Sequence, residues 1–353
     1  MTRPARRRTA IVWFATFTLL LHVAAYLAMD VVRPDLRDPE YGLRVPHLRA
    51  RIAEHPDRPL VVVVGSSRAA MGVRPAAWEA VRPGTPRDPL LFNMSSVGAA
   101  PIQQLITVRR LFADGFRPSA VLLEYWPPVL RQDGRHAEQA RVGRRLRFDD
   151  TPVIRDYFTD PEQTERGMVE ARVHSLSANR EAWRVRALPK WLTPNRHADV
   201  PWRDLDEWGW LPGMSVRPDD TATRERFLTH FRPAYRDQFD GHTIHAKSDR
   251  ALREAVALVR DHGARVGFLF LPESGEFRSW YPRQVEEAAR VHLTGLSREL
   301  GVPVLDARTW MADNLLADGF HLSRVGAATF TERLGPAVAK AIHCWKIGPA
   351  EGR

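Results

Sequence analysis

The chain has 353 residues, of which 44% are hydrophobic and 27% charged, so it can bury the core of one large or two ordinary domains and is not globally disordered. Its single cysteine, Cys344, excludes an internal disulfide and a cysteine-based zinc site. The net charge of +10 comes mostly from arginine, in a chain without lysine-rich tracts, zinc-finger spacing or aromatic RNA-binding motifs, so nucleic acid is not an expected partner.

The first predicted element is a membrane anchor over residues 1–29. An uncharged run covers residues 11–29, and as a helix it is about 28 Å long, close to the thickness of a hydrocarbon core. A cluster of arginines precedes this run: Arg3, Arg6, Arg7 and Arg8. These cations favour the cytoplasmic side, which places the rest of the chain on the extracytoplasmic side of a bacterial cytoplasmic membrane. A cleaved signal peptide is the alternative, but Tyr26 and Leu27 interrupt the small residues of a cleavage site, so we expect an uncleaved, single-pass anchor.

A charged, proline-containing stretch over residues 30–59 is expected to be a juxtamembrane linker with one short helix. Short apolar runs after it are predicted as strands: 60–64, 90–94, 120–125, 265–271 and 302–306. Helical patterns alternate with these strands: 102–113, 249–262, 284–300 and 324–342. This alternation predicts βαβ units and a parallel sheet covered by helices, formed by residues 60–129 and 248–345 and followed by a tail over 346–353.

Residues 130–247 interrupt the alternation and are predicted to be a largely helical and looped insertion packed over the sheet. The segment is rich in arginine, aspartate and tryptophan. Its tryptophans are Trp183, Trp191, Trp202, Trp208 and Trp210. An aromatic face can stack on the apolar side of a sugar ring, and core packing is the alternative that we favour.

Ligands of parallel sheets bind beyond the carboxyl ends of the strands, so the polar residues in those loops are the candidate site. Ser67 follows the first strand in Gly-Ser-Ser and comes just before an expected helix. A serine hydroxyl is a weak nucleophile unless a base takes its proton, and the free N–H groups of a helix start could face an oxyanion. An ordinary tight turn with a helix N-cap is the alternative interpretation.

A base and its partner are predicted at Asp318 and His321, which follow the last strand and precede the last helix. At this spacing the carboxylate can hold one imidazole nitrogen while the other nitrogen reaches a serine. A second Asp-x-x-His, at Asp133 and His136, leads into the insertion and is less favoured. A turn aspartate and a partly buried polar histidine are the alternative.

Other candidates lie in the remaining strand-end loops. In the turn over residues 93–98, Gly98 permits close approach of a ligand to the backbone, although an ordinary loop is the alternative. Weaker candidates for substrate contact are Arg68, Asn93, Glu124, Glu273 and Arg278. For the last two, a salt-bridged surface loop is an equally good interpretation.

Taken in order, Gly65-Ser66-Ser67, the Gly98 turn and Asp318-x-x-His321 resemble the SGNH/GDSL hydrolase superfamily, in its membrane-anchored extracytoplasmic branch. The resemblance implies a flavodoxin-like three-layer α/β/α parallel sheet and no metal or organic cofactor. It implies Ser67 as nucleophile, His321 as base and Asp318 as its orienting partner, with Ser67 and Gly98 as oxyanion donors. Two departures stand out: Ser66 replaces the usual aspartate, and Glu124 stands near the place of a Gly-x-Asn oxyanion asparagine.

These motifs predict a serine esterase or O-acyltransferase that acts, through an acyl-enzyme, on an ester-bearing small molecule or an extracytoplasmic polysaccharide. Envelope polysaccharide machinery is the expected protein partner. The alternative is a catalytically silent glycan-binding or scaffold protein of an envelope polysaccharide assembly, motivated by the missing asparagine and the tryptophan-rich insertion. A periplasmic solute binder fits less well, because the chain has one α/β pattern rather than two matched lobes.

Overall fold

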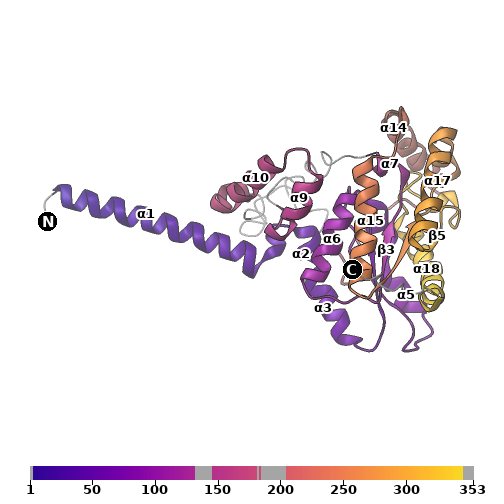
Figure 1. Ribbon diagram of the computed structural model, residues 1–353, viewed down its shortest axis with the longest axis horizontal. Helices are drawn as coiled ribbons and strands as arrows, with labels where there is room; N and C mark the ends of the chain where they lie inside the picture. The colour runs from indigo at the N-terminus through magenta and orange to yellow at the C-terminus, as the bar shows by residue number, and fades with distance from the viewer. Residues whose placement is uncertain (1–2, 132–144, 181–182, 184–203, 345–353) are drawn as a thin grey trace. The chain divides into compact units, whose positions relative to one another are not determined.

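The computed structural model of the chain describes residues 3–131, 145–180, 183 and 204–344 (Figure 1). It divides into two compact units. One unit comprises residues 1–43, 141–155 and 160–203, and the other, which contains the sheet, comprises residues 44–140, 156–159 and 204–353.

The sheet unit is built on five strands: β1 (Leu60–Val64), β2 (Leu90–Asn93), β3 (Ala120–Glu124), β4 (Arg265–Phe270) and β5 (Val304–Asp306). They form one sheet in the order β2-β1-β3-β4-β5, and every neighbouring pair is parallel. This order is that of a flavodoxin-like doubly wound sheet, so the predicted fold class is confirmed. All five strands fall within the predicted runs, which end one residue after β2, β3 and β4 and begin two residues before β5.

Strand β1 illustrates why short apolar runs in the sequence predicted the strands of this sheet. All five of its residues are buried, because helices cover both faces of the sheet. Val61 and Val63 face a core that includes Phe330 and Leu334 of the last helix. The alternate residues point to the opposite face, as the period of two in a strand requires.

Helices cover the two faces of the sheet (Figure 1). The long ones are α3 (Arg44–Glu54), α6 (Pro101–Ala113), α15 (Ala246–Asp261), α17 (Arg283–Leu300) and α18 (Arg324–Cys344), and α5 (Pro75–Val81) is shorter. Helix α6 packs beside α15 on one face, and α5 packs beside α18 on the other. The second pair is so close that a Cβ on Gly335 would lie 2.2 Å from a ring atom of Trp78.

Shorter elements follow the carboxyl ends of the strands and build the loops around the candidate site. They are α4 (Ser67–Gly72), α7 (Pro127–Leu130), α16 (Gly275–Ser279) and the 3₁₀ turn η7 (Asp313–Leu315). The longer helix α14 (Thr221–Phe239) comes from the segment predicted as an insertion, and it belongs to the sheet unit.

The other unit contains the N-terminal helix α1 (Arg3–Leu27), which runs into a π-helical turn, η1 (Ala28–Val32). Its further elements are η2 (Pro34–Leu36), α2 (Pro39–Gly42), η4 (Phe148–Asp150), α10 (Pro161–Val173) and α11 (Ser175–Ala178), and α9 (Thr151–Tyr157) has residues in both units. The segment Arg7–Val32 is long and apolar enough to cross a membrane, and only 6% of its most apolar window is buried.

Two predicted boundaries differ from the structure. The expected linker over 30–59 contains α2 and α3, and α3 belongs to the sheet unit because Arg44 and Leu48 are buried there. The predicted insertion over 130–247 is not one body, since residues 204–247 belong to the sheet unit and residues 160–203 to the other. Local composition does not show which core a segment joins, because that depends on contacts distant in sequence.

The tryptophans of this segment that the structure describes are buried or half-buried in the protein, which supports core packing over sugar stacking. Trp208 and Trp210 are buried, and the Trp210 indole N–H donates to the Met71 carbonyl at 2.7 Å. Trp183 is half-buried and donates to the Ser175 carbonyl. Trp191 and Trp202, like Asp133 and His136, lie outside the described residues.

Candidate active site

Ser67 lies at the carboxyl edge of the sheet, where β1 turns directly into α4. Ser66 is the N-cap of α4, and its hydroxyl accepts a hydrogen bond from the Arg68 backbone N–H at 3.2 Å. Gly65 leaves no room for a side chain, since a Cβ there would lie 2.5 Å from a Glu124 carboxylate oxygen. This tight strand–turn–helix connection leaves Ser67 half-buried at the first position of the helix, where the backbone N–H groups are not used within the helix.

The structure brings Ser67, His321 and Asp318 together in one hydrogen-bonded chain. Ser67 Oγ lies 2.8 Å from His321 Nε2, although the two residues are 254 positions apart in sequence. His321 Nδ1 lies 2.7 Å from Asp318 Oδ2. A carboxylate on Nδ1 favours the tautomer with its proton on that nitrogen, which leaves Nε2 free to accept the serine proton.

The local turn explains why Asp318 can hold His321. Asp318 is fully buried, and its Oδ1 accepts hydrogen bonds from the backbone N–H groups of Phe320 and His321 at 3.1 and 2.7 Å. Gly319 adopts a φ of 94°, and a Cβ there would lie 2.8 Å from Leu228. The turn therefore requires glycine at this position, and it directs both carboxylate oxygens to the histidine residue.

The turn after β2 packs against the Ser67 turn. Ser96 donates its backbone N–H to the Gly65 carbonyl at 2.9 Å. Gly98 adopts a φ of 72° in this turn, a conformation that favours glycine. The expected oxyanion donor is thus placed in a loop that contacts the residues preceding Ser67.

Asn93 was expected as a weak substrate contact, and the structure assigns it another role. It is fully buried, and its side-chain amide donates to the carbonyls of Ala69 and Val73 at 2.8 and 2.7 Å. Its Oδ1 accepts the backbone N–H of Ser95 at 3.0 Å. These bonds occupy the amide, so Asn93 joins α4 to the turn after β2 instead of facing a substrate.

Arg68 and Glu124 were also expected near the substrate, and both are buried below Ser67. Glu124 accepts the backbone N–H of Ser66, and its other carboxylate oxygen lies 3.7 Å from Arg68 Nη1. The side chains of both residues have an exposed fraction of 0%. They therefore cannot touch a substrate in this conformation, because both side chains point into the protein.

The end of β3 was where an asparagine donor was missing, and its side chains have other partners. Glu124 binds the Ser66 N–H, the Tyr125 hydroxyl donates to the Ala289 carbonyl at 3.0 Å, and the Trp126 indole N–H donates to Glu273 at 3.0 Å. The departure noted from the sequence is therefore a real feature of the site.

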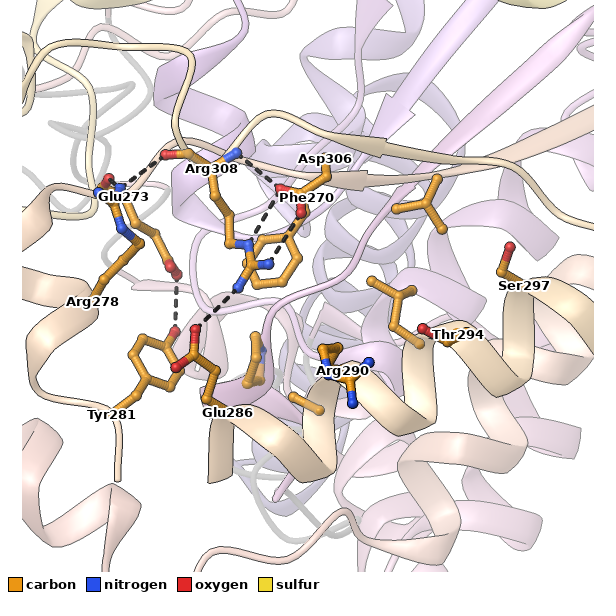
Figure 2. Close-up of a pocket in the computed structure, with 14 residues that line it drawn as sticks. Phe270, Glu273, Arg278, Tyr281, Glu286, Arg290, Thr294, Ser297, Asp306 and Arg308 are labelled. Carbon is orange, nitrogen blue, oxygen red and sulfur yellow. Dashed lines mark hydrogen bonds and ion pairs between the residues drawn. The ribbon is translucent and has the colours of Figure 1, made fainter. Parts of the chain in front are cut away.

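Glu273 and Arg278 line a cavity of about 240 Å³ at the carboxyl ends of β4 and β5 (Figure 2). Glu273 accepts a hydrogen bond from the Tyr281 hydroxyl at 2.9 Å, and Arg278 donates to the backbone carbonyl of Glu273. Burial raises the pKa of Glu273, and the nearby Arg68 opposes that shift. The residues that line this cavity do not include Ser67, His321 or Asp318.

The sequence did not predict that Arg68 connects the Ser67 turn with Glu273, which lines the cavity. Arg68 lies 3.6 Å from Glu273 as well as 3.7 Å from Glu124, and its guanidinium lies 4.6 Å from the Trp126 ring. The available signal was an arginine directly after the candidate nucleophile, among the small apolar residues of a helix that had to be buried. No group of three or more histidine, cysteine, aspartate or glutamate residues in metal-binding arrangement occurs in the part of the chain that the structure describes.

Two solved structures align with this chain over most of its length. A lipase/acylhydrolase from Enterococcus faecalis matches 83% of this chain and 100% of its own length, with 12% identity and a TM-score of 0.36. LAE5, an alpha/beta hydrolase enzyme from the metagenome of Lake Arreo, Spain, matches 81% of this chain and 95% of its own length, with 12% identity and a TM-score of 0.32. No family model and no curated protein matches the sequence. The strand order and side-chain contacts of this chain themselves define its fold and its candidate site.

Proposed function

We propose that the protein is a serine hydrolase of the SGNH type that cleaves carboxylic esters through an acyl-enzyme. The observation that carries the proposal is the continuous hydrogen-bonded chain from Ser67 Oγ through His321 to Asp318, at 2.8 and 2.7 Å. Such a chain at the carboxyl edge of a parallel sheet is the arrangement that nucleophilic serine catalysis needs.

In the first half-reaction, Ser67 Oγ attacks the ester carbonyl carbon while its proton passes to His321 Nε2. Asp318 accepts a hydrogen bond from the Nδ1–H of His321 and stabilises the imidazolium that forms. The backbone N–H of Ser67 and that of Gly98 are the proposed donors to the oxyanion. The carbon–oxygen bond to the leaving group then breaks, His321 gives its proton to the departing alkoxide, and the acyl group stays on Ser67.

In the second half-reaction, an incoming hydroxyl reverses these steps. His321 Nε2 takes the proton of that hydroxyl, the oxygen attacks the acyl carbon, and Ser67 leaves with the proton restored. Water as the nucleophile makes the protein an esterase, and a sugar hydroxyl makes it an O-acyltransferase. We propose an extracytoplasmic ester as the substrate, with a carbohydrate ester as the candidate that the family resemblance implies. The extracytoplasmic side is supported by Arg7–Val32, which has the length and composition of a membrane anchor with arginines on its N-terminal side.

One observation favours the second candidate function, a catalytically silent glycan-binding or scaffold protein. The three side chains at the end of β3 have other partners, so the donor expected from an asparagine has no replacement there. A protein with too little oxyanion stabilisation would keep the fold and lose turnover.

A serine-reactive fluorophosphonate probe separates these functions on the full-length protein in detergent. We expect covalent labelling of the wild type at Ser67, no labelling of Ser67→Ala, and unchanged labelling of Ser297→Ala, a half-buried serine in helix α17. Folded wild-type protein that remains unlabelled would contradict the hydrolase and support the silent protein. With an acetyl ester as substrate, added sugar acceptors then measure how the acyl group partitions between water and carbohydrate.

A further inference from the structure

We propose that Arg68 is a positioning residue of the active site: its guanidinium holds the peptide carbonyl that precedes His321 and thereby fixes the imidazole against Ser67. This inference rests on the proposed serine hydrolase function. It gives a role to a buried cation that the reaction itself does not use.

The contacts of Arg68 support this role because they reach two separate loops. Arg68 Nε donates to the Phe320 carbonyl at 3.1 Å, and Nη2 donates to the carbonyls of Leu271 and Pro272 at 2.9 and 3.0 Å. The first acceptor belongs to the turn that presents His321, and the other two follow strand β4. A planar guanidinium with several N–H donors can hold these acceptors at once, whereas a lysine ammonium lacks that fixed fork.

Nearby acids and an aromatic ring offset part of the cost of burying this charge. Arg68 Nη1 lies 3.7 Å from Glu124 and 3.6 Å from Glu273, and the side chains of all three are at most 1% exposed. The guanidinium also lies 4.6 Å from the ring of Trp126, which stacks on Phe320 with 5.9 Å between ring centroids. Burying a charge is costly unless it is paired, so a buried group of two acids and one arginine is retained here at an expense in desolvation.

The position of Arg68 in the chain makes the arrangement effective. Ser67 and Arg68 are consecutive residues at the start of α4. One helical turn therefore carries the nucleophile and also binds the turn that carries the base. This coupling sets the separation of Ser67 Oγ and His321 Nε2, and small misplacements of reacting groups reduce turnover strongly.

Two variants test the role without leaving an unpaired buried acid. Arg68→Lys keeps the positive charge and removes the guanidinium fork. The triple variant Arg68→Met/Glu124→Gln/Glu273→Gln removes the whole charged group, because breaking a buried ion pair on one side only is far more destabilising than replacing all of it. Arg44→Met is the matched control, since Arg44 is also 1% exposed and donates to the Gly209 carbonyl at 2.9 Å.

The measurement is kcat and KM for an acetyl ester, with active sites counted by fluorophosphonate titration so that unfolded protein does not contribute. We expect kcat per titrated site to fall about tenfold or more in Arg68→Lys and in the triple variant, with KM within about threefold of wild type, as for loss of an interaction that acts in the transition state. Arg44→Met should keep the wild-type kcat per site.

The inference is wrong if either Arg68 variant keeps kcat within about twofold of wild type, or if Arg44→Met shows the same fall. An Arg68→Lys protein that does not fold would also count against it, because the arginine would then serve the stability of the sheet unit. Failure of the proposed function is distinguishable, since in that case the wild type itself is not labelled by the probe.

Discussion

Among the described residues of the sheet unit, two histidine–aspartate pairs each bind a hydroxyl group, and their hydrogen-bond lengths are almost the same. In the first, His321 lies 2.7 Å from Asp318 and 2.8 Å from Ser67 Oγ. In the second, His292 lies 2.9 Å from an Asp249 oxygen and 3.0 Å from the Tyr125 hydroxyl. Hydrogen-bond length alone therefore does not distinguish a candidate catalytic chain from a structural one.

The environments of the two hydroxyls differ strongly. Tyr125 is fully buried, its hydroxyl also donates to the Ala289 carbonyl, and burial raises its pKa far above the usual range. Ser67 is half-buried and stands at the first position of a helix that follows a strand. Only the serine hydroxyl combines access from outside with nearby backbone N–H groups.

The two aspartates differ as well. Asp318 is fully buried and bonds only to its own turn and to His321 among the hydrogen bonds described. Asp249 also accepts a hydrogen bond from Arg253 at 2.8 Å. Burial alone would raise the pKa of Asp249, but the bonds from Arg253 and His292 outweigh that effect and lower the pKa. The first pair is arranged to serve one imidazole, whereas the second is part of a surface ion-pair group.

The largest expected difference between the pairs follows removal of the hydroxyl. Ser67→Ala should lower kcat/KM for an acetyl ester by about 10⁴-fold or more, because it removes the nucleophile. Tyr125→Phe should keep the activity, since the hydroxyl of this buried residue forms structural hydrogen bonds, to the Ala289 carbonyl and His292. Ester turnover of both purified variants is the measurement, and equal losses in the two would contradict the distinction drawn between the pairs.

The next effect concerns the aspartates. Asp318→Asn should lower kcat by about 10²- to 10⁴-fold, because an amide at this place favours the wrong histidine tautomer while leaving the turn nearly unchanged. Asp249→Asn should leave kcat within about twofold. Turnover of both variants is measured at the pH optimum, and thermal unfolding checks that each variant is folded. Normal turnover of Asp318→Asn would show that His321 does not depend on Asp318.

A smaller effect is expected in stability for the second pair. His292→Gln should lower the free energy of unfolding by about 1 kcal/mol, because it disturbs the hydrogen bonds to Tyr125 and Asp249. The loss is modest because Asp249 is only partly buried. Activity per folded molecule should not change. Denaturant unfolding monitored by circular dichroism checks the first expectation, and loss of activity without loss of stability would contradict the structural role.

The smallest expected effect is a change in how steeply the free energy of unfolding falls with decreasing pH. The lowered pKa of Asp249 in the folded state contributes stability that is present above the unfolded pKa, about 3.9, and is lost as pH falls through the folded pKa. Asp249→Asn should therefore lose less stability than wild type on acidification below about pH 4. The measurement is the free energy of unfolding of both proteins at several pH values. An equal loss of stability in the two proteins below about pH 4 would show that the Arg253 and His292 bonds do not stabilise the carboxylate.

The strands and the first histidine–aspartate pair could be predicted from the sequence for particular reasons. Residues 60–64 form an apolar, β-branched run, which is typical of a strand covered on both faces. Asp318 and His321 are three positions apart, so their contact is local and can be predicted from spacing. The second pair has no such signal, because His292 and Asp249 are separated by 43 positions on two helices.

The roles of polar residues near the site were harder to predict. Arg68, Asn93 and Glu124 occupy strand-end positions that predict substrate contact, yet all three are at most 1% exposed. A strand-end position places a residue at the correct edge of the sheet but does not determine whether its side chain points outward or into the layer below.

By itself, the amino-acid sequence determined the order of strands and helices, the apolar N-terminal helix, and the local Asp318 turn, since each depends on residues that are near one another in the chain. Only the tertiary structure decided that Ser67 meets His321 across 254 positions, that residues 130–247 divide between two units, and that Arg68 binds the loop of the base. The physical reason is that these contacts join segments distant in sequence, and burial or hydrogen bonding across such distances leaves no periodic pattern in the chain.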